Sequence, residues 1–232
     1  MSKFNFLSFF GKIFTEADTQ IVTVAAYVLL GAVLLFAVAL SIGKNKMRTI
    51  DIVYAGVALA ASFVLSYLKI APVPNGGSVT LASMLPVILY AYYFGFVRGL
   101  FVGLIYGLLQ FLQAPYILTP ATFALDYLLA FASISVMGLA RKFTGKSNAF
   151  VLFIGVTFVY AVRFLFHFAS GIIYFDMNAI WAELPADNAA VYSLLYQTVY
   201  LVPDWVICTA CILVLNKFGL VNRLAPAKFK TE

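Results

Sequence analysis

Four ionisable side chains stand within long apolar runs of this sequence: Asp126, Arg163, His167 and Asp204. An ionisable group is costly to place inside a bilayer, so it marks a functional site by default. Arg163 precedes His167 by four residues, which places both side chains on one face of a helix. Arg163 therefore has two open interpretations, a structural ion pair with a carboxylate deeper in the bundle or a direct role in the site.

The neighbouring sequence is rich in aromatic residues, which bind flat rings and cations through their faces. An acid, a histidine, the amide of Gln197 and aromatics from three loops together describe a small-molecule pocket. Its chemistry favours a planar, nitrogen-rich and cationic ligand. The aromatics in question are Tyr116, Tyr127, Tyr174, Phe175, Trp181, Tyr192 and Tyr196.

Catalysis and metal binding have little support in the sequence. The single histidine has no paired serine motif, acidic metal cluster or HExxH pattern around it, and no Walker motif occurs. Cys208 and Cys211 lie three residues apart in an apolar run and are interpreted as buried small side chains. We therefore expect no enzyme activity, no catalytic residues, no metal and no cofactor, and uphill transport must draw on an ion gradient or another subunit.

The elements that must position these residues are transmembrane helices. The chain has 232 residues, of which 64% are hydrophobic and 10% are charged, far from a soluble composition. The apolar runs do not alternate in polarity, so a β-barrel is excluded and an all-α polytopic membrane helix bundle is predicted. Seven segments are expected, at residues 21–42, 49–70, 79–95, 98–113, 122–140, 149–175 and 192–215.

Basic residues predict the orientation of the bundle. The loops at 71–78, 114–121 and 176–191 contain no Lys or Arg, whereas the alternate loops and the C-terminal tail carry them. By the positive-inside rule, the three uncharged or acidic loops and the N-terminus face outside and the C-terminus is cytoplasmic. The net charge of +6 is spread over loops, so a nucleic-acid partner is not expected.

Small residues mark helix contacts. Gly99, Gly103 and Gly107 recur at four-residue spacing and predict a helix buried against its neighbours. Gly56 and Ala60 form a similar smooth face, which either packs inside the chain or docks a partner helix.

Five sequence runs carry a family resemblance. Together they resemble the thiamine-specific substrate-binding (S) subunits of energy-coupling factor (ECF) transporters over about residues 49–216. The runs are GGSVTLASMLP (76–86), GFVRGLFVGLIYGLLQF (95–111), PYILTPATFALDYLLAF (115–131), RFLFHFASGIIYF (163–175) and VYSLLYQ (191–197).

The resemblance implies a six-helix binding subunit that docks onto a transmembrane coupling subunit carrying two ATPase subunits. The domains are then an interfacial segment with an extra transmembrane helix at 1–48, the binding domain at 49–216 and a basic cytoplasmic tail at 217–232. Gly56 and Ala60 would supply the docking face. The implied substrate-binding residues are Tyr116, Asp126, Tyr127, His167, Gly171, Phe175, Tyr192 and Gln197.

This sequence departs from the family pattern in three of those positions. Asp126 replaces the usual glutamate, and Gln197 replaces the usual asparagine. Phe175 stands at the position where the family pattern has a tryptophan-like aromatic residue. The expected ligand is thus thiamine or a related pyrimidine or thiazole compound. Asp204 matches no pocket position, and we expect its removal to leave affinity nearly unchanged.

The sequence therefore predicts a subunit of a vitamin importer in the cell membrane of a bacterium. Two rivals stay open. An ion-coupled secondary carrier of a small heterocycle would use Asp126, Arg163 and His167 as a relay, and would be favoured by inverted repeats, which are not visible. An intramembrane enzyme would need paired acids or metal ligands, which the sequence lacks.

Overall fold

The computed structural model describes residues 27–28, 31, 48–141 and 148–226. Its long helices are α3 (Thr49–Ser66), α5 (Phe96–Gln113), α9 (Ala149–Asp176) and α10 (Ala189–Lys217), and α4 (Leu85–Phe94) and α11 (Leu220–Leu224) are short. A composite helix consists of α6 (Pro120–Phe123), the π turn η2 (Ala124–Leu129), α7 (Ala130–Ala132), η3 (Ser133–Val136) and α8 (Met137–Ala140). A hairpin of β1 (Lys69–Pro72) and β2 (Ser78–Thr80), joined by η1 (Pro74–Gly76), follows α3.

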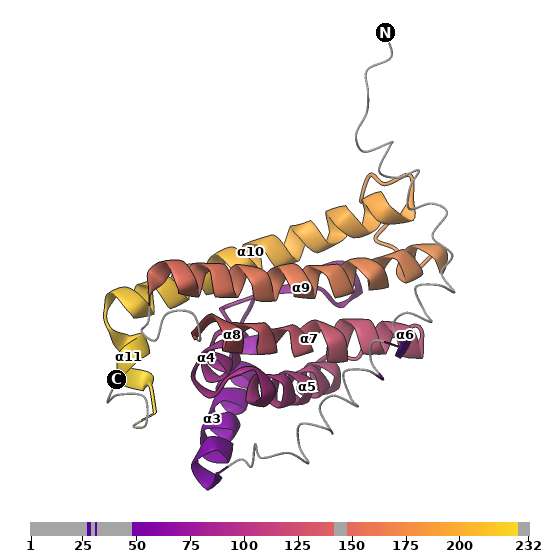
Figure 1. Ribbon diagram of the computed structural model, residues 1–232. Helices are drawn as coiled ribbons and strands as arrows, with labels where there is room; N and C mark the ends of the chain where they lie inside the picture. Colours follow the sequence, from indigo (N-terminus) through magenta and orange to yellow (C-terminus); the bar gives the residue numbers. More distant parts are fainter. Residues whose placement is uncertain (1–26, 29–30, 32–47, 142–147, 227–232) are drawn as a thin grey trace.

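Among the described residues, five helices are long and apolar enough to cross a membrane: α3, α5, the composite helix, α9 and α10. Figure 1 shows that α10 packs on α9, α9 on the composite helix and the composite helix on α5. The predicted all-α membrane bundle is thus confirmed. The expected segment 1–48 with its helix 21–42 falls almost wholly outside the described residues, as does the end of the tail 217–232 beyond residue 226.

Polar caps fix where three of these helices begin. The side chains of Thr119, Asn148 and Asn188 accept hydrogen bonds from backbone amides in the first turns of α6, α9 and α10. These bonds satisfy amides that have no partner within the helix. The caps place the starts of α6 and α10 beside the β1–β2 hairpin end of the bundle.

The glycine face of α5 packs directly against the composite helix. A Cβ at Gly107 would lie 1.9 Å from the carbonyl oxygen of Tyr127, and a Cβ at Gly103 would lie 2.4 Å from that of Phe131. Only glycine allows this approach, so the predicted burial of this helix is confirmed. On α3 the arrangement is reversed, because Gly56 meets nothing within 4 Å and faces away from the bundle.

The segment expected to span the membrane at 79–95 does not do so. The helix α4 has 10 residues, about 15 Å at 1.5 Å per residue, which is half of a bilayer core of about 30 Å. Hydropathy missed the interruption because its causes are local. The backbone amide of Thr80 donates a hydrogen bond to Asp204, and Ala82 has a left-handed conformation with φ of 52°. The segment 49–70 likewise ends as a helix at Ser66.

Candidate functional site

A cavity opens at the end of the bundle where the β1–β2 hairpin meets the loops that precede α6 and α10. Its empty volume, open mouth included, is about 860 Å³. Seven of the eight predicted binding residues line it: Tyr116, Asp126, Tyr127, His167, Gly171, Tyr192 and Gln197. The eighth, Phe175, packs against Tyr192, with ring centroids 5.7 Å apart.

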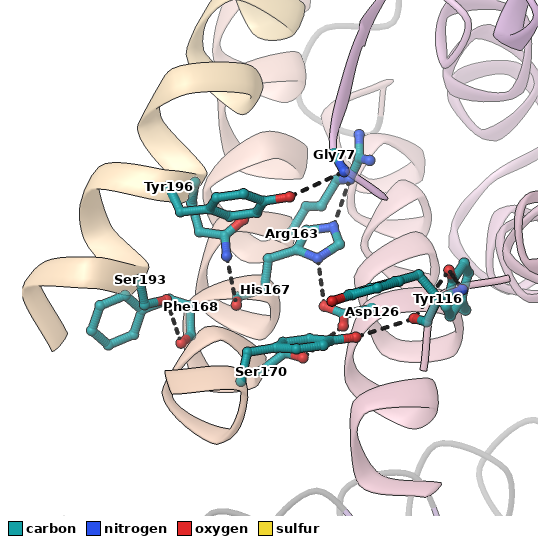
Figure 2. Close-up of polar contacts among 12 residues, drawn as sticks. Gly77, Tyr116, Asp126, Arg163, His167, Phe168, Ser170, Ser193 and Tyr196 are labelled. Carbon is teal, nitrogen blue, oxygen red and sulfur yellow. Dashed lines mark hydrogen bonds and ion pairs between the residues drawn. The ribbon is translucent and has the colours of Figure 1, made fainter. Parts of the chain in front are cut away.

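Asp126 lies on the π turn η2 and reaches the cavity from the composite helix. Figure 2 shows its two carboxylate oxygens bonded to α9: Oδ1 lies 2.7 Å from Nδ1 of His167, and Oδ2 accepts from the hydroxyl of Ser170 at 2.6 Å. A π turn widens the helix by one residue and occurs frequently at functional sites. The carboxylate retains 16% of its exposure, so a ligand in the cavity can still reach it.

The hydrogen bonds around His167 define its tautomer. Nε of Arg163 donates to Nε2 of His167 at 3.2 Å. Arginine has no acceptor, so Nε2 must present its lone pair and Nδ1 must carry the proton. His167 is then a neutral imidazole that donates through Nδ1 to Asp126 (Figure 2).

Arg163 has its charge partner in Asp204. Its Nη1 atom lies 3.6 Å from Oδ2 of Asp204, and its guanidinium lies over the Phe131 ring at 4.7 Å. The predicted ion pair with a deeper carboxylate is confirmed. Asp204 itself lies outside the cavity lining and accepts from the Thr80 amide at 3.0 Å and from the Tyr160 hydroxyl at 2.8 Å.

These contacts leave one charge in the cavity without an opposite charge beside it. Arg163 and Asp204 compensate each other, whereas Asp126 is bonded to a neutral imidazole and a neutral hydroxyl. Among the ion pairs of the described residues, Asp126 meets only this histidine. Asp126 is the carboxylate in the cavity lining, where Lys69 from β1 and Arg163 supply the positive charges.

Aromatic rings form the walls. Tyr192 and Tyr196 stack on each other with centroids 5.9 Å apart, and Tyr200 presents its edge or face to His167 at 6.1 Å. On the other side, Tyr116 stacks on Tyr174 at 5.5 Å. Burial raises the pKa of the Tyr116 phenol in its loop, so this hydroxyl stays protonated at neutral pH.

Several lining residues were not predicted as binding residues. Tyr192, Tyr196 and Tyr200 recur every four residues on α10, a spacing that indicates a single aromatic face and would have identified the last two. A polar corner is formed by the ends of α3 and α5, where Gln113 accepts from Ser66 at 2.6 Å and from Gln110 at 3.2 Å. Tyr174 and Tyr196 were expected as aromatics of the pocket, and a direct role of Arg163 was left open, although none of the three was among the implied binding residues. The lining residues that the sequence did not place in the pocket include Ser66, Lys69, Asn75, Gln110, Gln113 and Tyr200.

The hairpin is tied to the cavity wall by Tyr196. Its hydroxyl donates to the carbonyl of Pro74 at 2.6 Å and accepts from the amide of Gly77 at 3.1 Å (Figure 2). Asn75 adds a bond to the carbonyl of Ala179 at 3.2 Å. The hairpin thus covers one side of the cavity through bonds to α10 and to the loop before it.

Gln197 presents an oriented acceptor. Its Nε2 donates to the carbonyl of His167 at 3.0 Å, which leaves Oε1 buried and without a partner in the described part of the chain. Gly171 allows this approach of α9 and α10, because a Cβ there would lie 2.2 Å from the Ser193 hydroxyl oxygen. Across the residues that the structure describes, no group of three or more His, Cys, Asp or Glu side chains is placed to hold a metal.

An apolar helix bundle with a polar, aromatic-lined cavity at one end defines a membrane protein that binds a small molecule. A profile of the family described as Thiamine transporter protein (Thia_YuaJ) matches residues 52–222. The thiamine transporter ThiT of Bacillus subtilis (strain 168) is 28% identical over 179 residues, which cover 71% of this chain and 88% of that protein. The solved structure of ThiT from Listeria monocytogenes aligns with a TM-score of 0.63 and 21% identity, over 76% of this chain and 99% of that chain.

The family match spans more than half of the chain, so this chain belongs to the thiamine transporter protein family. The resemblance inferred from sequence motifs is thereby confirmed. The chain is a multi-pass membrane transport protein of a thiamine transporter family and not an enzyme.

Proposed function

We propose that the cavity binds thiamine from outside the cell and that the chain delivers it through an ATPase-driven coupling module. The observation that carries this proposal is the state of Asp126, a partly exposed carboxylate whose hydrogen-bond partners, His167 and Ser170, are neutral. Thiamine carries a permanent positive charge on its thiazolium ring, and such a cation gains from both the carboxylate and the tyrosine faces.

The aminopyrimidine ring of thiamine supplies a second complement. Its amino group is a donor, and Oε1 of Gln197 is a buried acceptor without a partner in the described residues. An unsatisfied buried acceptor costs free energy until a ligand fills it. Tyr192 and Tyr196 form the flat surface on which a ring stacks.

Titration of purified wild-type protein with thiamine tests the assignment, and Trp181 is a natural reporter because its amide donates to the Tyr192 hydroxyl at 3.0 Å. A Trp205→Phe background leaves Trp181 as the sole tryptophan of the two in the chain. Saturable quenching by thiamine supports the proposal. A response to thiazole or pyrimidine fragments but not to thiamine would assign a different ligand, and mass spectrometry of co-purified small molecules would identify it.

The proposed orientation places the cavity outside and the C-terminus in the cytoplasm of a bacterium. Support comes from two arginines at the end of the bundle opposite the hairpin, since basic residues are enriched on the cytoplasmic side. Arg48 and Arg98 both contact Asp51 there, at 3.4 and 3.2 Å. We expect a cysteine at the exposed loop position Ala182 to react with an impermeant reagent on intact cells, and one at exposed Phe218 to stay unlabelled. Both are made after Cys208→Ala and Cys211→Ala, and the reverse labelling would contradict the orientation.

The proposed partners are a transmembrane coupling subunit and two ATPase subunits, with Gly56 and Ala60 on the docking face. Both residues are on the exposed side of α3, while Ala58 and Ser62 of the same helix are buried. The extra helix at 21–42 and the six-helix domain at 49–216 belong to the same proposal. Uptake without ATP by this chain alone would favour the ion-coupled carrier.

A further inference from the structure

Arg163 connects a buried anion to the single histidine of the chain. Its side chain is 11% exposed and lies between Oδ2 of Asp204, at 3.6 Å, and Nε2 of His167, at 3.2 Å. The stack on Phe131 at 4.7 Å further restricts the guanidinium. Asp204 is held in turn by Thr80 and Tyr160, so each member of this chain of contacts has a fixed position.

The contact with Arg163 blocks the only site at which neutral His167 can take up a proton. Nδ1 already carries a hydrogen toward Asp126, so a second proton must bind at Nε2. There it would face the Nε hydrogen of Arg163 across 3.2 Å, beside a permanent positive charge. Burial of the His167 ring disfavours its charged form, the neighbouring carboxylate of Asp126 favours that form, and the charge of Arg163 adds to the effect of burial.

We propose that Arg163, anchored by Asp204, is a positioning residue that keeps His167 unprotonated, so that Asp126 stays available to the ligand cation at acidic pH. An imidazolium 2.7 Å from Asp126 would neutralise that carboxylate and compete with the thiazolium. This role rests on the proposed binding of thiamine in the cavity. This role of Arg163 also explains why a buried arginine lines a cavity that we propose binds a cation.

The other groups near His167 do not replace Arg163. Gln197 contacts its backbone carbonyl, and the tyrosines remain neutral over the relevant pH range. Lys69 lines the same cavity from β1, on the hairpin side. The titratable and charged groups that face the ring or share its cavity are Lys69, Tyr116, Asp126, Tyr127, Arg163, Tyr174, Tyr192, Tyr196 and Tyr200.

Nuclear magnetic resonance of protein labelled with ¹⁵N-histidine tests the proposal without any ligand. Because the chain has one histidine, the imidazole signals belong to His167 once any purification tag is removed. Wild-type protein should keep the neutral Nδ1–H tautomer from pH 7.5 to pH 5.5. In Arg163→Met, which cannot donate to Nε2, the imidazole should take up a proton over this range.

Arg163→Met leaves Asp204 without its cation, which threatens folding. The double variant Arg163→Met/Asp204→Asn removes both charges and should show the same protonation. Arg98→Met is the matched control, since it breaks a partly buried arginine–aspartate pair at the other end of the bundle. It should leave the His167 spectrum unchanged.

Thiamine titration over the same pH range gives the functional readout. For each protein, the dissociation constant at pH 5.5 is divided by that at pH 7.5. This ratio should be about tenfold larger for either Arg163 variant than for wild type, because a histidine of ordinary pKa near 6.5 is about 90% protonated at pH 5.5. Adding His167→Asn should remove this extra pH dependence, and protonation of thiamine itself is common to all proteins. His167 titrating in wild type, or staying neutral in both Arg163 variants, would overturn the proposal. If the His167 signals behave as expected but the wild-type protein does not bind thiamine, the result counts against the proposed function and not against the role of Arg163.

Discussion

Two buried aspartates illustrate how environment assigns different roles to the same side chain. Asp204 accepts hydrogen bonds from a backbone amide and two hydroxyls, forms an ion pair with a guanidinium, and is 3% exposed. Asp126 accepts from neutral donors and keeps 16% of its side-chain exposure. The first is saturated by the protein, and the second has lone pairs left for a ligand.

We expect Asp126→Asn to weaken thiamine binding by about ten- to a hundredfold. The amide keeps the shape of the carboxylate but loses its charge, and a charge-assisted contact contributes about 1.5–3 kcal/mol. Fluorescence titration of matched folded protein measures the change. Asp187→Asn, at an exposed position of the loop before α10, removes the same charge outside the cavity and should bind as wild type does. Equal affinity in the Asp126 variant would misplace the site.

The residues of the site were predictable to the extent that polar groups inside apolar runs are few. Asp126, His167 and Arg163 stood out for this reason, and the contact between Arg163 and His167 follows from their four-residue spacing on α9. Tyr200 and Gln113 did not stand out, because tyrosine and glutamine are uncharged and the chain has many tyrosines. Only the fold shows that these two side chains line the cavity.

At the level of elements, the β1–β2 hairpin covers one side of the cavity, and the Tyr196 hydroxyl makes two of the hydrogen bonds that hold it there. We expect Tyr196→Phe to raise the thiamine dissociation constant by about two- to tenfold, mainly through faster dissociation, since a net hydrogen bond contributes about 0.5–1.5 kcal/mol. The ring that stacks on Tyr192 remains in place. Stopped-flow fluorescence separates the two rates.

Tyr93→Phe is the corresponding control. Its hydroxyl also donates to a backbone carbonyl, that of Val221, but at the α11 end of the bundle. The variant should bind and release thiamine as wild type does, even where its thermal stability falls. If both variants release thiamine faster, the effect belongs to general loosening and not to the hairpin.

The hairpin is also the element that sequence patterns could not predict. Residues 79–95 are apolar enough to pass as a span, and the deciding contact joins Thr80 to Asp204 across 124 positions of the chain. Hydropathy windows carry no information on such a pair. The remaining long helices were predictable, because each is strongly apolar over at least 18 residues in spite of isolated polar residues within it.

Considered as a whole, the molecule has its proposed docking face on the exposed side of α3, and this helix reaches the cavity through Ser66 at its end. We expect Ala60→Leu to lower ATP-dependent uptake in vesicles with the coupling and ATPase subunits by about tenfold, because overpacking a contact costs about 1–3 kcal/mol. Thiamine binding to the isolated chain should be unchanged. Ala161→Leu places the same bulk on the exposed side of α9 and should affect neither. Loss of binding in the Ala60 variant would show that this face supports the bundle instead.

The shortness of α4 also has an electrical consequence. Its 10 residues cover about 15 Å, and the β1–β2 hairpin that precedes it lines the cavity, so in the proposed orientation we expect water in the cavity to carry the external potential part of the way across the membrane. Most of the transmembrane voltage then falls across the dry part below the cavity. Binding of the thiazolium should be nearly independent of voltage, whereas its release into a negative interior is favoured by up to about 2.3 kcal/mol per 100 mV.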